Sequence, residues 1–97
     1  MASQNLIQEA AFILRRLAES TPTNSDQLPE WYNRSREFQA FLKAHPAVCD
    51  VMPHFVHHYL ADADIRAREP EYRAEQQGQI LEIISEFEAG RIPPDSA

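Results

Sequence analysis

Residues 6–17, with the sequence LIQEAAFILRRL, carry apolar side chains at the spacing of one face of an α-helix. Apolar residues that recur every three or four positions lie on one side of a helix and can be buried together. The members of this set are Leu6, Ile7, Ala10, Ile13, Leu14 and Leu17. The pattern predicts a helix over residues 5–19, and the Ser-, Thr- and Pro-containing stretch at 20–26 predicts a loop after it.

Proline residues set the limits of the second predicted helix, over residues 29–44. Pro29 suits a first helical turn, where a missing N–H costs nothing. The helix stops before Pro46, because the residue that precedes a proline avoids the α conformation. Trp31 and Phe38 share the apolar stripe of this helix, so we expect Trp31 to be buried rather than to stack on a base.

Two further helices are predicted in the second half of the chain. Pro53 is tolerated in a first turn if Asp50 is the N-cap, which predicts a turn at 46–49 and a helix over 51–68. The last helix is predicted over 71–89. The sequence therefore predicts an all-α fold, a single small bundle of about four helices. At this stage the last two helices can form either a hairpin or an extended arm.

The length of 97 residues corresponds to one domain. We expect residues 1–90 to form it, with Gly90 ending the last helix and a disordered, proline-containing tail at 91–97. Leu, Ile, Val and Phe make up about 23% of the chain, only slightly above the roughly 20% below which highly charged chains stay disordered. The predicted core is therefore thin, and a partner or a second copy would add to its stability.

Several protein classes are disfavoured by the sequence. The longest uninterrupted apolar run covers residues 10–14, far short of the about 20 residues of a membrane-spanning helix. Arg15 and Arg16 follow the first apolar stretch, whereas a signal peptide begins with its basic residues. The single cysteine, Cys49, permits no internal disulfide and no cysteine-based zinc cluster. We therefore expect a cytoplasmic protein that does not enter a membrane.

The net charge of −6 lies in the second half of the chain. Residues 1–48 contain five acidic and five basic residues, whereas residues 49–97 contain ten acidic and four basic ones. A nucleic-acid-binding surface needs clustered Lys and Arg, so this charge disfavours DNA or RNA as a partner. An acidic surface still suits a basic protein partner.

Metal binding along the third predicted helix is an alternative function. His54, His58 and Asp62 follow one another at intervals of four, so on a continuous helix they would share one face and hold one divalent transition metal. The competing interpretation is a solvated polar face, on which Asp62 pairs with His58 or Arg66. The same histidines would act as a pH switch only at an interface.

Cys49 is the one candidate nucleophile that the sequence suggests. A thiol just before a helix N-terminus can have a lowered pKa, but the adjacent Asp50 opposes this effect with its negative charge. No oriented base and no nucleophile elbow accompany the cysteine. We therefore expect a small packed thiol and no enzymatic activity.

The position of Phe12 indicates association with another protein. Phe12 lies outside the apolar stripe of its helix and next to Arg15 and Arg16. Aromatic residues flanked by arginine are typical of interface anchors, although a single exposed apolar residue is also common.

The last predicted helix has an apolar face that is wider than a helix needs to pack against a single neighbour. Its apolar side chains span an arc of about 160°, compared with the ~100° of a helix that has one buried face. Leu81 and Ile84 lie in this arc, and Gly78 beside it would allow another helix to approach closely. A central position in a monomeric bundle would explain the same pattern.

These observations favour a small acidic helical protein that acts by binding another protein, as a homodimer, in a regulatory, inhibitory or accessory role. The residues expected at the contact are Phe12, Arg15, Arg16, Gly78, Leu81 and Ile84. No cofactor is expected unless the metal alternative holds.

Overall fold

The computed structural model of the chain describes residues 4–93. Within that range every regular element is helical and no strand is present. The elements are α1 (Gln4–Glu19), a 3-10 turn at Ser25–Gln27, α2 (Leu28–Ala44), α3 (Pro46–Asp50), α4 (His54–Ala61), α5 (Ala63–Arg68) and α6 (Pro70–Glu88). The all-α prediction is confirmed, and the bundle of about four helices is an approximation. None of these helices is both long and apolar enough to cross a membrane.

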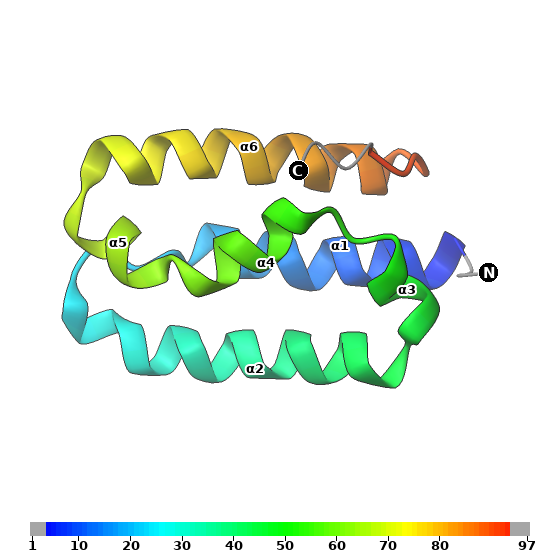
Figure 1. Cartoon of the computed structure of the whole chain (residues 1–97), viewed down its shortest axis with the longest axis horizontal. Coiled ribbons are helices and arrows are strands. Elements are labelled where there is room, and N and C mark those ends of the chain that lie inside the picture. The colour runs from blue at the N-terminus through cyan, green and yellow to red at the C-terminus, as the bar shows by residue number, and fades with distance from the viewer. Residues whose placement is uncertain (1–3, 94–97) are drawn as a thin grey trace.

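The three long helices form a layer with α1 in the middle. In Figure 1, α6 runs along the top, α1 along the centre and α2 along the bottom. α1 packs against both of the others, while the short helices α3, α4 and α5 follow one another along the layer. α4 and α5 contact α6, and α3 and α5 contact α2. α6 therefore folds back against α5 as a hairpin, and the extended arm is not formed.

The core combines side chains from the long helices with side chains from α3 and α4. Completely buried residues include Phe38, Val48, Val56, Tyr59, Ile80, Ile84 and Phe87. Trp31 is buried as predicted, and its indole N–H donates to the carbonyl oxygen of Leu17 at 3.0 Å. This bond satisfies the one polar atom of the indole ring, which a buried tryptophan requires.

The buried face of α1 is shifted from the predicted stripe. Most of the stripe is buried, but Leu6 and Ile13 are only half-buried, while Ala11 and Ala18 are buried instead. α6 approaches on the alanine side, where the Gln77 amide donates to the carbonyl oxygen of Ala18 at 3.0 Å. Small side chains permit this contact between the two helices.

The prediction of one helix over 51–68 is wrong. α3 occupies the predicted turn, with Pro46 in its first turn, and Asp50 ends α3 instead of capping the next helix. Pro53 has extended backbone, with φ −60° and ψ 149°, and precedes α4. Its ring constrains the residue before it, and its missing N–H leaves one helical hydrogen bond unmade. A second break lies at Asp62, between α4 and α5.

The end of α6 is close to the prediction. Gly90 has a positive φ of 80°, the conformation that glycine adopts most easily. Its N–H donates to the Phe87 carbonyl at 3.0 Å, and the Arg91 N–H donates to the Glu86 carbonyl at 2.8 Å. This pair of bonds is the usual end of a helix that stops at glycine. Residues 91–93 of the predicted tail follow without regular structure, and 94–97 lie outside the described residues.

Candidate interaction surface

Phe12 is the most exposed large apolar side chain among the described residues, with 61% of its surface accessible. Ala10 and Leu14 are buried on the opposite side of α1, so the helical period turns Phe12 away from the core. The Arg16 guanidinium lies over the phenyl ring, 5.8 Å from its centroid. This cation–π contact holds the ring in a defined position without covering it.

Arg15 connects the Phe12 surface to α6. Its Nε and Nη2 atoms donate to the two carboxylate oxygens of Glu88, each at 2.7 Å. The hydrogen bond to Arg15 holds the pKa of Glu88 below its ordinary value, and the hydrogen bond to Glu88 raises the pKa of Arg15. Arg15 therefore fixes α1 against α6 rather than being free to contact a partner through its charge.

A recess of about 520 Å³ lies beside the phenyl ring. Phe12, Arg15, Arg16 and Glu19 of α1 line it together with Ser20, which follows α1, and Arg34 of α2. Arg34 pairs with Glu30 one turn earlier on α2, with 3.1 Å between Nη2 and Oε1. We call Phe12, Arg15, Arg16 and Arg34 the α1 patch.

A second, larger hollow of about 870 Å³ lies along α6 and the start of α4. Its apolar wall includes Pro53, Phe55, Leu81 and Ile83, and its acidic residues are Glu82 and Glu86. We call these six residues the α6 groove. Leu81 is 38% exposed there, as the wide apolar arc predicted.

Gly78 and Ile84, the other two residues expected at a contact, have different positions. Gly78 is exposed beside the α6 groove, in the lining of the same hollow, and a Cβ atom built on it would meet nothing within 4 Å. No neighbouring helix in the monomer therefore requires a glycine there. Ile84 is completely buried in the core, so its assignment to the contact surface is wrong. The wide arc arises because α6 packs on α1, α4 and α5 at once.

The three residues of the metal alternative are not brought together. His54 and His58 are exposed on α4, but the helix ends before Asp62. The Asp62 carboxylate accepts hydrogen bonds from Tyr72 at 2.6 Å and from Gln76 at 3.0 Å, both on α6. In residues 4–93 no group of three or more His, Cys, Asp or Glu side chains is placed to hold a metal ion. The expected shared face is lost at the break in the helix.

Cys49 lies within α3 and not in front of a helix. It is half-buried at the fourth position of α3. Cys49 is a packing residue beside the core, as expected from the sequence.

Arg66 is 0% exposed, although its spacing from Asp62 predicted a surface position. Its Nε donates to the Thr21 hydroxyl at 3.0 Å, and its Nη1 donates to the Gln76 side-chain oxygen at 2.8 Å and to the Tyr59 carbonyl. The guanidinium carbon lies 3.6 Å from the centroid of the Tyr59 ring. Nη2 has no hydrogen-bond partner. The signal for burial was the position of Arg66 beside Ala67 on the apolar side of its helix.

Asp62 balances the charge of Arg66 through an intermediate side chain. The Gln76 amide donates from nitrogen to Asp62 and accepts at oxygen from Arg66. The expected surface ion pair between Asp62 and Arg66 is therefore wrong, because Arg66 turns inward. Burial lowers the pKa of Arg66, and the nearby Tyr59 and Asp62 oppose this shift. We call Thr21, Tyr59, Asp62, Arg66 and Gln76 the Arg66 network.

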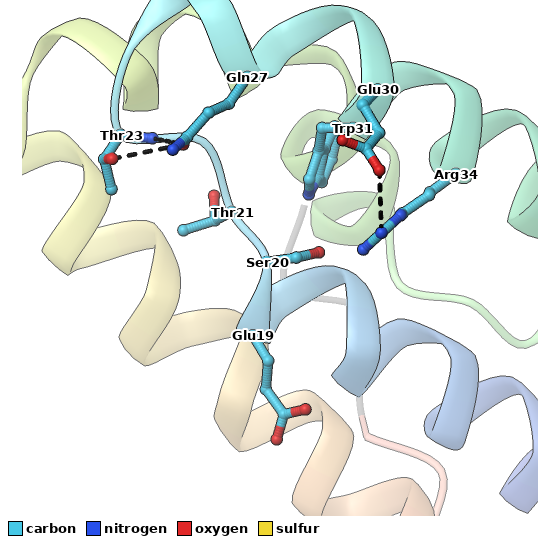
Figure 2. Close-up of a pocket in the computed structure, with 8 residues that line it drawn as sticks. All are labelled: Glu19, Ser20, Thr21, Thr23, Gln27, Glu30, Trp31 and Arg34. Atoms are coloured by element: carbon cyan, nitrogen blue, oxygen red, sulfur yellow. Dashed lines mark hydrogen bonds and ion pairs between the residues drawn. The ribbon is translucent and has the colours of Figure 1, made fainter.

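Another recess, of about 380 Å³, lies where the chain passes from α1 to α2 (Figure 2). Its hydroxyl groups are already engaged within the chain. Ser20 donates to the Arg16 carbonyl at 3.0 Å, Thr21 accepts from Arg66, and Thr23 bonds to Gln27. In Figure 2 the Glu19 carboxylate points away from the other lining residues. These groups stabilise the loop and offer a ligand few free donors.

The α1 patch and the α6 groove are two surfaces whose exposed apolar side chains, Phe12 and Leu81, are not covered by the packing of the described residues. Comparisons with protein-family models, with curated proteins and with solved structures find no match for the chain.

Proposed function

We propose that this protein acts by binding protein rather than by catalysis, and that a second copy of the chain binds at the α1 patch. A homodimer is the smallest assembly that this binding produces. The observation that carries the proposal is the 61% exposure of Phe12 in the middle helix of the layer. An aromatic side chain with arginines around it has the composition of an interface hot spot.

The surroundings of Phe12 support an anchor rather than an isolated apolar residue. Arg16 packs against the ring and keeps its hydrogen-bonding groups available, while Arg15 and Glu88 hold α1 and α6 in a fixed relation. A pre-organised side chain loses less conformational entropy on binding than a mobile one. A rigid aromatic contact with a cationic rim suits a protein surface that offers both apolar and acidic groups.

The unpaired Cys49 supports a cytoplasmic location, and the acidic charge supports a protein as the partner. A lone unpaired cysteine is usual in the reducing cytoplasm, where we place the protein. The acidic balance of residues 49–97 favours a protein partner over nucleic acid.

The substitution Phe12→Asp tests this proposal by placing a charge at the centre of the α1 patch. We expect the variant to be monomeric by native mass spectrometry and by sedimentation velocity at concentrations where the natural sequence associates. Its helical circular dichroism should be unchanged, because exposed substitutions alter the free energy of unfolding by no more than about 0.5 kcal/mol.

Ala40→Asp is the matched control, since it adds the same charge at an exposed position of α2 outside the patch. This variant should associate like the natural sequence. A Phe12→Asp variant that associates with unchanged affinity, or a natural chain that is monomeric at all accessible concentrations, would contradict the proposal.

A further inference from the structure

We infer that the α1 patch of one copy docks into the α6 groove of the next copy, so that the chain associates head to tail. This inference rests on the proposed function, because it names the surface that receives Phe12. The two surfaces share no lining residue, so one copy can offer its patch and accept a partner in its groove at the same time.

The two surfaces are complementary in shape and polarity. The α1 patch projects one exposed aromatic side chain, and the α6 groove is the larger of the two hollows and has an apolar wall that includes Phe55, Leu81 and Ile83. Placing Phe12 against Leu81 would cover two of the most exposed large apolar side chains of the described residues in one contact. Removal of apolar surface from water is the main favourable term in association.

The charges beside these two side chains have opposite signs. Arg16 lies against Phe12, and Glu82 directly follows Leu81. Neither Arg16 nor Glu82 forms an ion pair with another residue of the range 4–93, whereas Arg15 and Glu86 are paired with Glu88 and Arg91. Each surface thus has one unpaired charge, and docking would bring the two together.

A symmetric dimer would place like charges opposite each other. Two α1 patches in contact would bring Arg16 against the patch of the partner, which also contains Arg34. Two α6 helices in contact would do the same with acidic residues, since α6 contains five glutamates and one arginine. Like-charge contacts at an interface are costly, so the charge pattern favours the unlike pair of surfaces. Such an arrangement either closes into a ring or extends as a chain of copies.

Mixing two complementary variants distinguishes head-to-tail from symmetric association. Phe12→Asp removes the patch and keeps the groove, and Leu81→Asp damages the groove and keeps the patch. We expect each variant alone to be monomeric, with association weakened by about tenfold or more, as for a hot-spot residue. Mixed in equal amounts, they should form a heterodimer with one intact contact and no larger species. Native mass spectrometry identifies it, because the two variants differ in mass.

The outcomes separate this inference from the proposed function. Phe12→Asp and Leu81→Asp variants that are each monomeric and stay monomeric on mixing would overturn head-to-tail docking, because the intact patch of one variant would then fail to bind the intact groove of the other. A Leu81→Asp variant that associates like the natural sequence would also overturn it and would leave the α1 patch as a symmetric contact. Unchanged association of Phe12→Asp would instead refute the proposed function itself.

A charge reversal gives a second test that does not depend on the folding of Leu81→Asp. Arg16→Glu and Glu82→Arg both alter exposed residues of long helices. Each variant alone should associate about tenfold or more weakly, because it places like charges in contact. A mixture of the two restores opposite charges at every contact and should recover the association. Failure of the mixture to recover it, with both variants folded by circular dichroism, would overturn the assigned contact.

Discussion

Arg66 and Arg16 each lie over an aromatic ring, but the two contacts differ in what surrounds them. The Arg66 guanidinium is 3.6 Å from the Tyr59 centroid and has no exposed surface. The Arg16 guanidinium is 5.8 Å from the Phe12 centroid and remains exposed to water. A buried charge must be compensated by hydrogen bonds within the protein, whereas an exposed charge is compensated by water. The same pair of groups therefore stabilises the fold in one place and leaves a surface available for binding in the other.

Arg66 holds several segments of the fold together through its hydrogen bonds. Its hydrogen bonds reach the loop after α1 at Thr21, the carbonyl of Tyr59 in α4, and Gln76 in α6. Arg73 of α6 also donates to the Arg66 carbonyl at 2.9 Å. One side chain thus connects segments that are far apart in the sequence, and its removal would leave several buried acceptors without donors.

The largest expected effect is the loss of stability in an Arg66→Ala variant. The substitution creates a cavity and leaves the Tyr59 carbonyl and the Gln76 oxygen unbonded, so we expect a loss of about 3–4 kcal/mol in the free energy of unfolding. The total free energy of unfolding of a small domain is about 5–15 kcal/mol, so this loss would be a large part of it. Urea denaturation monitored by circular dichroism measures the change.

Arg16→Ala is the matched control for this substitution, since it removes the same side chain from an exposed cation–π contact. Its urea midpoint should stay close to that of the natural sequence. Arg66→Lys should recover only part of the lost stability, because an ammonium group lacks the planar fork that meets three acceptors. Equal losses of stability for Arg66→Ala and Arg16→Ala would contradict the expectation that the buried contact contributes more to stability than the exposed one.

Helical period and proline positions were enough to predict the all-α fold and three of the helices within one residue at each end. They were not enough for residues 51–68, where two breaks occur. The apolar pattern of that segment continues through both breaks, so periodicity alone does not reveal them. Only the contacts of Asp62 with Tyr72 and Gln76 of α6 explain where the chain turns at the second break.

The candidate surfaces were predictable to a similar extent. Phe12 lies off the apolar stripe of its own helix, so its exposure follows from local sequence. The burial of Ile84 and of Arg66 depends on which helices surround them. The spacing of residues along the sequence does not identify those neighbouring helices. Arg66 was assigned to the surface because its charge and its spacing from Asp62 match an exposed helical pair. Its contact with Trp31 comes from a segment distant in the sequence.

A smaller effect of opposite sign is expected at Gly78, on the exposed side of α6. A methyl group added there meets no atom within 4 Å, so Gly78→Ala should stabilise the monomer by about 1 kcal/mol through helix propensity alone. Gly90→Ala is the contrasting control, because the positive φ of 80° should cost an alanine about 1–2 kcal/mol. Thermal unfolding of both variants measures the two shifts. Destabilisation by Gly78→Ala would show that the exposed side of α6 is more constrained than its packing indicates.

The smallest expected effect concerns Glu88 and Arg15, whose ion pair is bidentate but more than a third exposed. Glu88→Gln should lower Tm by about 1–2 °C at neutral pH and low salt, and by less at high salt, because exposed pairs are screened. The hydrogen bond from Arg15 holds the pKa of Glu88 below its ordinary value of 4.5. The contribution of the pair is therefore complete above pH 4.5 and disappears as the pH falls through the lowered pKa of the folded state. The Tm values of the two proteins should converge in that acidic range. A difference that persists below it, or that is insensitive to salt, would mean that Glu88 acts through packing on α1 and not through its charge.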